Sequence, residues 1–208
     1  IIAQFSGGAD KIAEQSGVRF GKEALDALNF YVDFANPASS FNTWNDSLKY
    51  SLDSFADGTT AIIFDYASSF PKIKSKNPYL DFGISAMPQI SLDVQPVNYA
   101  DYWGLAVSKQ SKNGAWAWHF IVSITTDSSI AETYSKNNSL PPALLSLIEK
   151  YKNDPKTGIF ARQVLTARSW SQPDGTEVKN ILSNMVESVL SGKSSPQNAL
   201  NEAENAIN

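Results

Sequence analysis

The sequence predicts an α/β fold in which strands and helices alternate through the first half of the chain and helices dominate after residue 110. Three observations support this. Apolar residues recur at helical spacing between residues 22 and 35. The run 60–66 is rich in β-branched and aromatic residues, as strands are. From Lys112 onward, apolar residues repeat almost continuously at helical spacing. Alternation of the two kinds of element is typical of a layered α/β architecture.

The composition of the chain limits its chemistry. It has 208 residues, 42% of them hydrophobic and 18% charged, which suits one large domain or two small lobes. The net charge is −4 and the basic residues form no stripe, so we expect no nucleic-acid partner. The absence of cysteine rules out disulfides and thiolate metal sites. No apolar run approaches the roughly 18 residues that a membrane helix needs.

Two helices are predicted before residue 60. The first covers about 22–35 and ends at Asn36-Pro37, because a residue that precedes proline disfavours the helical conformation. The second covers about 46–56, and Gly58 follows it in the position of a C-cap glycine. Their predicted apolar faces are Leu25, Leu28, Tyr31 and Val32 in the first, and Leu48, Leu52 and Phe55 in the second.

Three strands are predicted, at 60–66, at 79–89 and within 97–109. In the last of these, the run 105–107 reads as a buried strand that follows a cluster of large rings. Gly104 stands between the rings and the strand, where it lets the backbone run close to a neighbour or to a ligand. Strand ends are where α/β sheets bind ligands, so the position of these rings is compatible with a ligand contact as well as with packing.

The helices predicted after Lys112 carry clear start and stop signals. Asp174 begins a capping-box pattern with Glu177, and Gly192 closes that helix. Ser195-Pro196 has the form of an N-cap followed by the first helical residue. The predicted inward positions are Ala117, Phe120, Ile121, Ile124, Leu144, Leu145, Ile148, Tyr151, Val178, Ile181, Leu182, Met185, Val189, Ala199, Ala203 and Ile207.

The residues give little support for catalysis or for a metal or cofactor. His119 is the single histidine, and its place within a predicted helix favours a structural or surface role. No nucleophile motif, phosphate-binding loop or cluster of metal ligands is present in the sequence. Asp65 and Asp101 each adjoin an aromatic residue. Each is either a loop acid that caps a backbone group or a ligand contact, and the residues alone leave both open.

Three blocks of the sequence, in order, resemble the solute-binding proteins of ABC importers, of the group that includes maltose-binding protein. The first block is FADGTTAIIFDYASSFPKIKSKNPYLDFGISAMPQ, the second is YWGLAVSKQSKNGAWAWHFIVSITTDSSIAETYSKNNSLPP, and the third is VLSGKSSPQNALNEAENAIN. In the first block, Ile62 stands where the family usually has methionine. The matching positions in the first and third blocks are Phe55, Gly58, Ala61, Ile62, Phe82, Gly83, Pro88, Gly192, Ala199, Leu200 and Ala203.

The resemblance implies a periplasmic-binding-protein-like (type II) fold, of which this chain would be the C-terminal portion. Residues 1–95 would then belong to the second lobe, 96–145 would cross to the first lobe, and 146–208 would return to the second. The N-terminal half of the family's usual length would be missing and would be a partner of this chain.

The resemblance also implies the site. It places a ligand-contacting ring at Trp103 or its neighbour Tyr102, although the residues alone favour Trp103 in the core and Tyr102 on the surface. Two further contacts are expected, at Asp65-Tyr66 and at Trp170, for which a packing role is as good an interpretation. Trp44 is a weaker candidate than its alternative, a hydrophobic staple at a helix start. Trp116 and Trp118 are assigned to packing. The predicted ligand-contacting residues are Trp103, Tyr102, Tyr66, Asp65, Trp170, Gly104, Asp101 and Trp44.

The function that the resemblance implies is that of a binding protein and not an enzyme. It would capture a carbohydrate between two lobes, close by a hinge and deliver it to a membrane permease. Its location would be extracytoplasmic, in the periplasm or on the cell surface, with a lipid anchor left open. The alternatives are a binding protein for a polyamine, peptide or osmolyte, a glycan-active enzyme that uses two carboxylates, and an adhesive surface protein.

Overall fold

The structure, a computed structural model, describes residues 1–14, 17–45, 47–91, 93, 95–155, 157–170, 172 and 174–208. The chain forms two compact units. Unit 1 consists of Ile1–Leu48, Gln89–Tyr99 and Ala167–Asn208, and unit 2 consists of Lys49–Pro88 and Ala100–Thr166. The lobe boundaries predicted from the sequence, 1–95, 96–145 and 146–208, stay a prediction.

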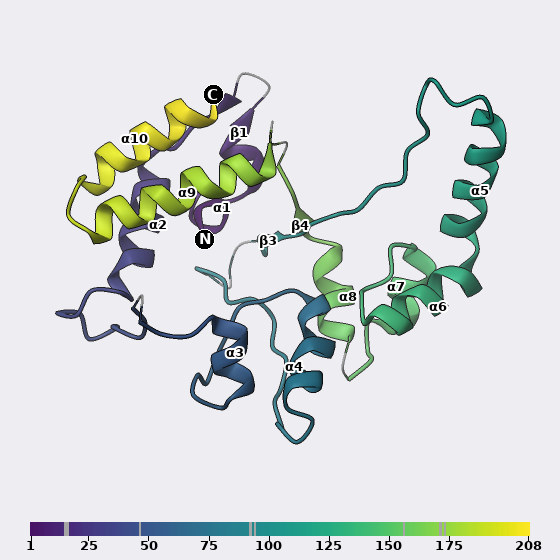
Figure 1. Cartoon of the computed structure of the whole chain (residues 1–208), viewed down its shortest axis with the longest axis horizontal. Coiled ribbons are helices and arrows are strands. Elements are labelled where there is room, and N and C mark those ends of the chain that lie inside the picture. The colour runs from purple at the N-terminus through teal and green to yellow at the C-terminus, as the bar shows by residue number, and fades with distance from the viewer. Residues whose placement is uncertain are drawn as a thin grey trace. The chain divides into compact units, whose positions relative to one another are not determined.

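Unit 1 combines short strand pairs with a group of longer helices (Figure 1). Strand β1 pairs antiparallel with β2, and β3 pairs in parallel with β4, bringing Asn98 beside Ala167. The predicted helix at 22–35 is confirmed as α2. The elements of unit 1 are α1 (Ile2–Phe5), the 3-10 turn η1 (Ala9–Lys11), β1 (Ala13–Glu14), β2 (Gly17–Val18), α2 (Lys22–Asp33), β3 (Asn98–Tyr99), β4 (Ala167–Arg168), α9 (Gly175–Leu190) and α10 (Pro196–Ile207).

The core of unit 1 lies where α2, α9 and α10 pack together. Leu200 of α10 is fully buried there, a position that stabilises the fold by roughly 1.5–3 kcal/mol relative to exposure. Of the predicted apolar face of α2, Leu28 is buried and Leu25 and Val32 pack against the core, while Tyr31 remains 40% exposed. The buried members of the core are Val18, Phe20, Ala24, Leu28, Val178, Met185, Ala199, Leu200, Ala203 and Ile207.

Both predicted N-caps of unit 1 are confirmed. The Asp174 carboxylate accepts hydrogen bonds from the backbone N–H groups of Thr176 (2.8 Å) and Glu177 (3.1 Å) at the start of α9. The Ser195 hydroxyl accepts from the backbone N–H of Asn198 (3.3 Å) at the start of α10, directly before Pro196. Each cap satisfies backbone donors that have no partner within the helix.

Side chains at the end of α10 form hydrogen bonds with the backbone of β2 and of the residues just after it. Asn208 accepts a hydrogen bond from the backbone N–H of Val18 (2.6 Å) and donates one to the Val18 carbonyl (3.0 Å). Glu204 accepts from the backbone N–H of Phe20 (2.5 Å). Gly17 adopts φ +123°, and a Cβ there would lie 2.1 Å from Asn208 Oδ1, so only glycine allows this approach.

Unit 2 is built mainly from short helices. The helix predicted at 46–56 is shorter than expected and begins at Ser51; Asp46 lies outside the described residues. Gly58 has φ +76° after this helix, as predicted for a C-cap glycine. The elements of unit 2 are α3 (Ser51–Ala56), η2 (Ala67–Ser69), α4 (Phe70–Lys76), α5 (Gly114–Thr126), α6 (Ser128–Asn138), α7 (Leu145–Tyr151) and α8 (Gly158–Val164).

The strands predicted at 60–66, 79–89 and 105–107 are wrong for this structure. None of these segments pairs with a strand among the described residues. Leu105, predicted to be buried, is 57% exposed. A strand is stabilised by hydrogen bonds to a neighbouring strand, and no described segment supplies one here. At these positions, residue composition alone is therefore not enough to predict a strand.

Helix α5 confirms the helical prediction after Lys112 but not the predicted burial. None of its residues is buried. Trp116 and Trp118, assigned to packing from the sequence, are 77% and 52% exposed, and Phe120 is 64% exposed. His119 is exposed as expected, with its ring 6.2 Å from that of Trp116. The packing assignment is therefore wrong for these two tryptophans in this structure, since half or more of each is exposed.

Helices α6 and α7 are joined by a polar cluster around Glu132. Lys136 (2.7 Å) and Lys150 (2.9 Å) form ion pairs with its carboxylate, and the Tyr151 hydroxyl donates a hydrogen bond to it. Hydrogen bonds from Lys136, Tyr151 and Lys150 lower the pKa of Glu132 to about 2. The bonds to Glu132 and Tyr151 raise the pKa of Lys136 to about 12.

Replacement of Glu132 by glutamine should lower the melting temperature at neutral pH, because it removes a charge that two lysines share. The folded pKa of Glu132, about 2, lies below its ordinary value of 4.5. The stabilisation is therefore complete above pH 4.5 and is lost as pH falls through about 2. Thermal unfolding of Glu132→Gln and the parent between pH 2 and 7 measures this. A difference in melting temperature that does not shrink on acidification would contradict it.

The matched control is Glu149→Gln on α7. Among the described residues, Glu149 forms an ion pair with Lys152 alone, three residues away, and its side chain is 63% exposed. Exposed pairs of this kind contribute little to stability. The melting temperature of Glu149→Gln should therefore fall less than that of Glu132→Gln.

Candidate functional site

The segment predicted to carry the main ligand contacts follows β3 and belongs to unit 2. Trp103 is 98% exposed and Tyr102 is 57% exposed. Asp101 and Gly104 are also exposed. A Cβ built on Gly104 would meet no atom within 4 Å, so this glycine does not accommodate a neighbouring part of the chain. Trp103 is thus a surface ring and not a core residue.

Asp65 and Tyr66 lie just before η2, also in unit 2. The Asp65 carboxylate accepts a hydrogen bond from the backbone N–H of Tyr66 (2.7 Å). This is the local capping role that the sequence left open for Asp65. Tyr66 is 52% exposed, so half of its side-chain surface is accessible to a ligand.

The two remaining predicted residues, Trp44 and Trp170, belong to unit 1. Trp170 is half-buried and packs against the core formed by α2, α9 and α10. The Trp44 ring lies 6.3 Å from that of Tyr31, and its backbone N–H donates to the Phe34 carbonyl (3.3 Å). Trp44 therefore packs against the C-terminal end of α2. A staple at the start of the next helix is excluded, since α3 begins at Ser51.

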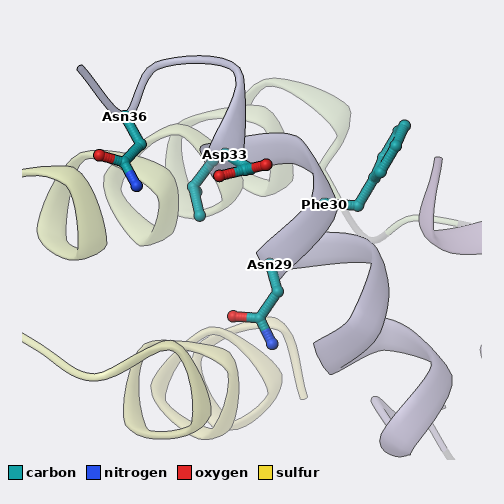
Figure 2. Close-up of a pocket in the computed structure, with 5 residues that line it drawn as sticks. Asn29, Phe30, Asp33 and Asn36 are labelled. Atoms are coloured by element: carbon teal, nitrogen blue, oxygen red, sulfur yellow. The ribbon is translucent and has the colours of Figure 1, made fainter. Parts of the chain in front are cut away.

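A hollow of about 490 Å³ lies on α2, and none of the predicted ligand-contacting residues lines it. Its lining residues are Asn29, Phe30, Val32, Asp33 and Asn36. In Figure 2 the Asp33 carboxylate lies between the amide of Asn36 and the ring of Phe30, and Asn29 precedes Asp33 by one turn. The sequence pointed only to the apolar face of this helix. The signal for the hollow was the spacing of Asn29 and Asp33, four residues apart.

The described residues contain no group of three or more histidine, cysteine, aspartate or glutamate side chains that could hold a metal ion. Glu132, with its pKa lowered to about 2, remains ionised at neutral pH and is a poor proton donor. In the part of the chain that the structure describes, no helix has both the length and the apolar character needed to cross a bilayer.

Solved structures share the fold of this chain. An ABC transporter solute-binding protein of Thermotoga lettingae TMO, bound with α-D-tagatose, has 23% identity and a TM-score of 0.74, with 100% of this chain and 54% of that chain covered. The maltose-maltodextrin binding protein of Alicyclobacillus acidocaldarius has 18% identity and a TM-score of 0.74, with 99% and 58% covered. The cyclic α-maltosyl-1,6-maltose binding protein of Arthrobacter globiformis has 18% identity and a TM-score of 0.65, with 100% and 53% covered.

The fold is therefore that of the type II periplasmic binding proteins, as the resemblance implied, and the chain covers a part of it. Residues 2–159 match the family model of the bacterial extracellular solute-binding proteins, and the chain belongs to that family. No curated protein sequence matches it. The chain spans little more than half the length of these solved structures.

The exposures of the two tryptophans predict different effects of their removal on folding. Because Trp103 makes almost no contact, Trp103→Ala should change the free energy of unfolding by no more than about 0.5 kcal/mol. Trp170→Ala removes a ring that packs on the core of unit 1 and should cost about 1–3 kcal/mol. Urea unfolding of the 208-residue chain measures both. A core-sized loss for Trp103→Ala would show that this ring is structural.

Proposed function

We propose that this chain is part of an extracytoplasmic solute-binding component of an ABC importer that binds a carbohydrate. The ligand lies between two lobes, which close on it by a hinge, and the loaded protein delivers it to a membrane permease. The protein resides in the periplasm or on the cell surface, where a lipid anchor would hold it.

The observation that carries this proposal is the pair of exposed rings, Tyr102 and Trp103, directly after β3. Two adjacent exposed rings form an apolar patch, and such patches mark binding surfaces more often than single exposed residues do. Flat rings offer an apolar face to the C–H side of a sugar, while the tyrosine O–H and indole N–H bond its hydroxyls. Such rings also lose little rotamer freedom on binding.

The structural neighbours support a carbohydrate as the solute. One neighbour is bound with tagatose, the second is a maltose-maltodextrin binding protein, and the third is a cyclic maltosyl-maltose binding protein. We propose the same class for this chain, with Tyr66, Asp65 and Asp101 of unit 2 as further contacts and Gly104 leaving room for the ligand. Trp103 is the central contact of this set.

Two other functions stay open. Carboxylates beside aromatic rings, as at Asp65-Tyr66 and Asp101-Tyr102, also suit a cationic solute such as a polyamine. The same two carboxylates could serve a glycan-active enzyme, which needs an acid and a second carboxylate across a glycosidic bond. Turnover distinguishes the enzyme: mass spectrometry of an oligosaccharide incubated with the protein should recover it unchanged.

In the full-length protein, Trp103→Ala should weaken carbohydrate binding by about 30-fold, which corresponds to about 2 kcal/mol for a central ring. Isothermal titration calorimetry with maltose, mannobiose, tagatose and maltodextrins provides the measurement, and spermidine and glycine betaine test the cationic alternative. Unchanged affinity would contradict the assignment of Trp103.

Tyr79→Ala is the matched control for this experiment. Tyr79 is an aromatic residue of unit 2 that is 95% exposed and lies outside the predicted site. Its removal should leave carbohydrate affinity unchanged. A loss equal to that of Trp103→Ala would show that the effect reflects exposed rings in general and not a site.

We also propose that a further part of the protein, the N-terminal half of the family's usual length, packs on α5. Helix α5 exposes several large apolar side chains, with Trp116, Trp118, Phe120 and Val122 more than half exposed. A helix of this character is stable in a protein when other elements bury it. The neighbours, whose chains are nearly twice as long, have the additional residues for such packing.

The 208-residue chain by itself should therefore self-associate and bind carbohydrate poorly. Trp116→Lys with Phe120→Lys should shift it toward the monomer in sedimentation velocity, whereas Tyr79→Lys with Phe41→Lys, which also removes two exposed rings, should not. A monomeric parent chain that binds an oligosaccharide with micromolar affinity would contradict the proposed second half.

A further inference from the structure

We propose that the hollow on α2 is a binding site for a neutral, polyhydroxylated ligand the size of a small sugar. All of its lining residues belong to unit 1, on α2 and the turn that follows it. The inference does not rest on the proposed function, because none of the residues assigned to carbohydrate import lines this hollow.

The polar side of the hollow is a row of side chains with a fixed spacing. Asn29 and Asp33 lie four residues apart on α2 and therefore share a face of the helix. Asn36 follows in the turn, where its Oδ1 accepts a hydrogen bond from the backbone N–H of Ala38 (3.0 Å). This bond orients the Asn36 amide and leaves its N–H groups as donors.

Two members of this row, Asn29 and Asp33, do not use their side-chain hydrogen-bonding groups within the described residues. In the part of the chain that the structure describes, no side-chain hydrogen bond or ion pair involves the Asn29 amide or the Asp33 carboxylate. Together with Asn36 they offer amide donors, amide acceptors and carboxylate acceptors within two turns of helix. A hydroxyl group, which both donates and accepts, suits this mixture.

The other side of the hollow is the ring of Phe30. It is 49% exposed, so much of it is accessible. Its position is set by Phe5, with ring centroids 5.6 Å apart, and by Phe34, with centroids 5.0 Å apart and ring planes at 86°. A ring supported in this way provides a preorganised apolar surface for the C–H groups of a sugar.

Other ligand classes fit this hollow less well. An anion would meet the Asp33 carboxylate with no cationic residue in the lining to offset it. An entirely apolar ligand would cover the amides and the carboxylate without hydrogen-bonding them, which is costly. A cation would find one carboxylate but would face the N–H groups of two amides. A neutral polyol pairs with every group in the lining.

The binding should be weak. Asn29, Phe30 and Asn36 are all exposed, so the hollow is shallow and a ligand in it keeps much of its own surface in water. Ligand pockets that bind tightly cover most of the ligand. We therefore expect a dissociation constant in the millimolar range.

The test is an NMR titration of the 208-residue chain with methyl α-D-glucopyranoside in a Trp103→Ala background, which removes the central contact proposed above. The side-chain amide signals of Asn29 and Asn36 should shift and saturate at tens of millimolar, whereas sulfate and glycine betaine should leave them in place. Persistence of this binding in Trp103→Ala separates the hollow from the proposed import site, so either proposal can fail without the other.

Matched variants decide whether the hollow is the site. Phe30→Ala and Asn29→Ala should each weaken binding by about fivefold or more. Phe41→Ala, which also contacts Phe34 but does not line the hollow, and Asn184→Ala, an exposed asparagine of α9, should leave affinity within about twofold. Asn29 is exposed, so its variant should fold even if Phe30→Ala does not. No saturable shift, or equal losses in test and control variants, would overturn the proposal.

Discussion

Burial of α10 between α2 and α9 is the interaction on which unit 1 depends. Leu200 is fully buried in α10, and the small residues Ala199 and Ala203 beside it allow the helices to approach closely. The same packing fixes the outer face of α2, because the buried Leu28 sets the rotation of that helix. Asn29, Phe30 and Asp33 are then directed outward. The position of the hollow is thus a consequence of the core behind it.

Local signals in the sequence were sufficient to predict the helices but not the strands. Asp174 and Ser195 cap their helices through bonds to residues two or three positions away, so their roles are visible in a short window of sequence. The strands predicted at 60–66 and 105–107 depend on partners far along the chain, and such pairing leaves no local signature. The predicted burial of Trp116 and Trp118 was wrong for the same reason. Burial of a helix residue depends on elements elsewhere in the chain, and a short stretch of sequence does not show them.

The candidate site, too, could be predicted from the sequence only in part. The type of residue at Trp103 indicated contact chemistry, and its 98% exposure agrees with a ring that is available to a ligand. For Trp170 the sequence left a ligand contact and a packing role equally open, and Trp170 packs on the core of unit 1. The hollow was missed because Asn29, Asp33 and Asn36 read as an ordinary solvated helix face. The contact of Phe5 with the Phe30 ring joins α1 to α2, and the sequence of α2 alone does not reveal it.

The hydrogen bonds that Asn208 and Glu204 accept from Val18 and Phe20 have a consequence for the order in which unit 1 folds. The acceptors lie 190 and 184 positions later in sequence than the amides that donate to them. All of unit 2 is translated in between. The contacts of Val18 and Phe20 with the end of α10 can therefore form only after unit 2 has been synthesised, and such long-range contacts form slowly.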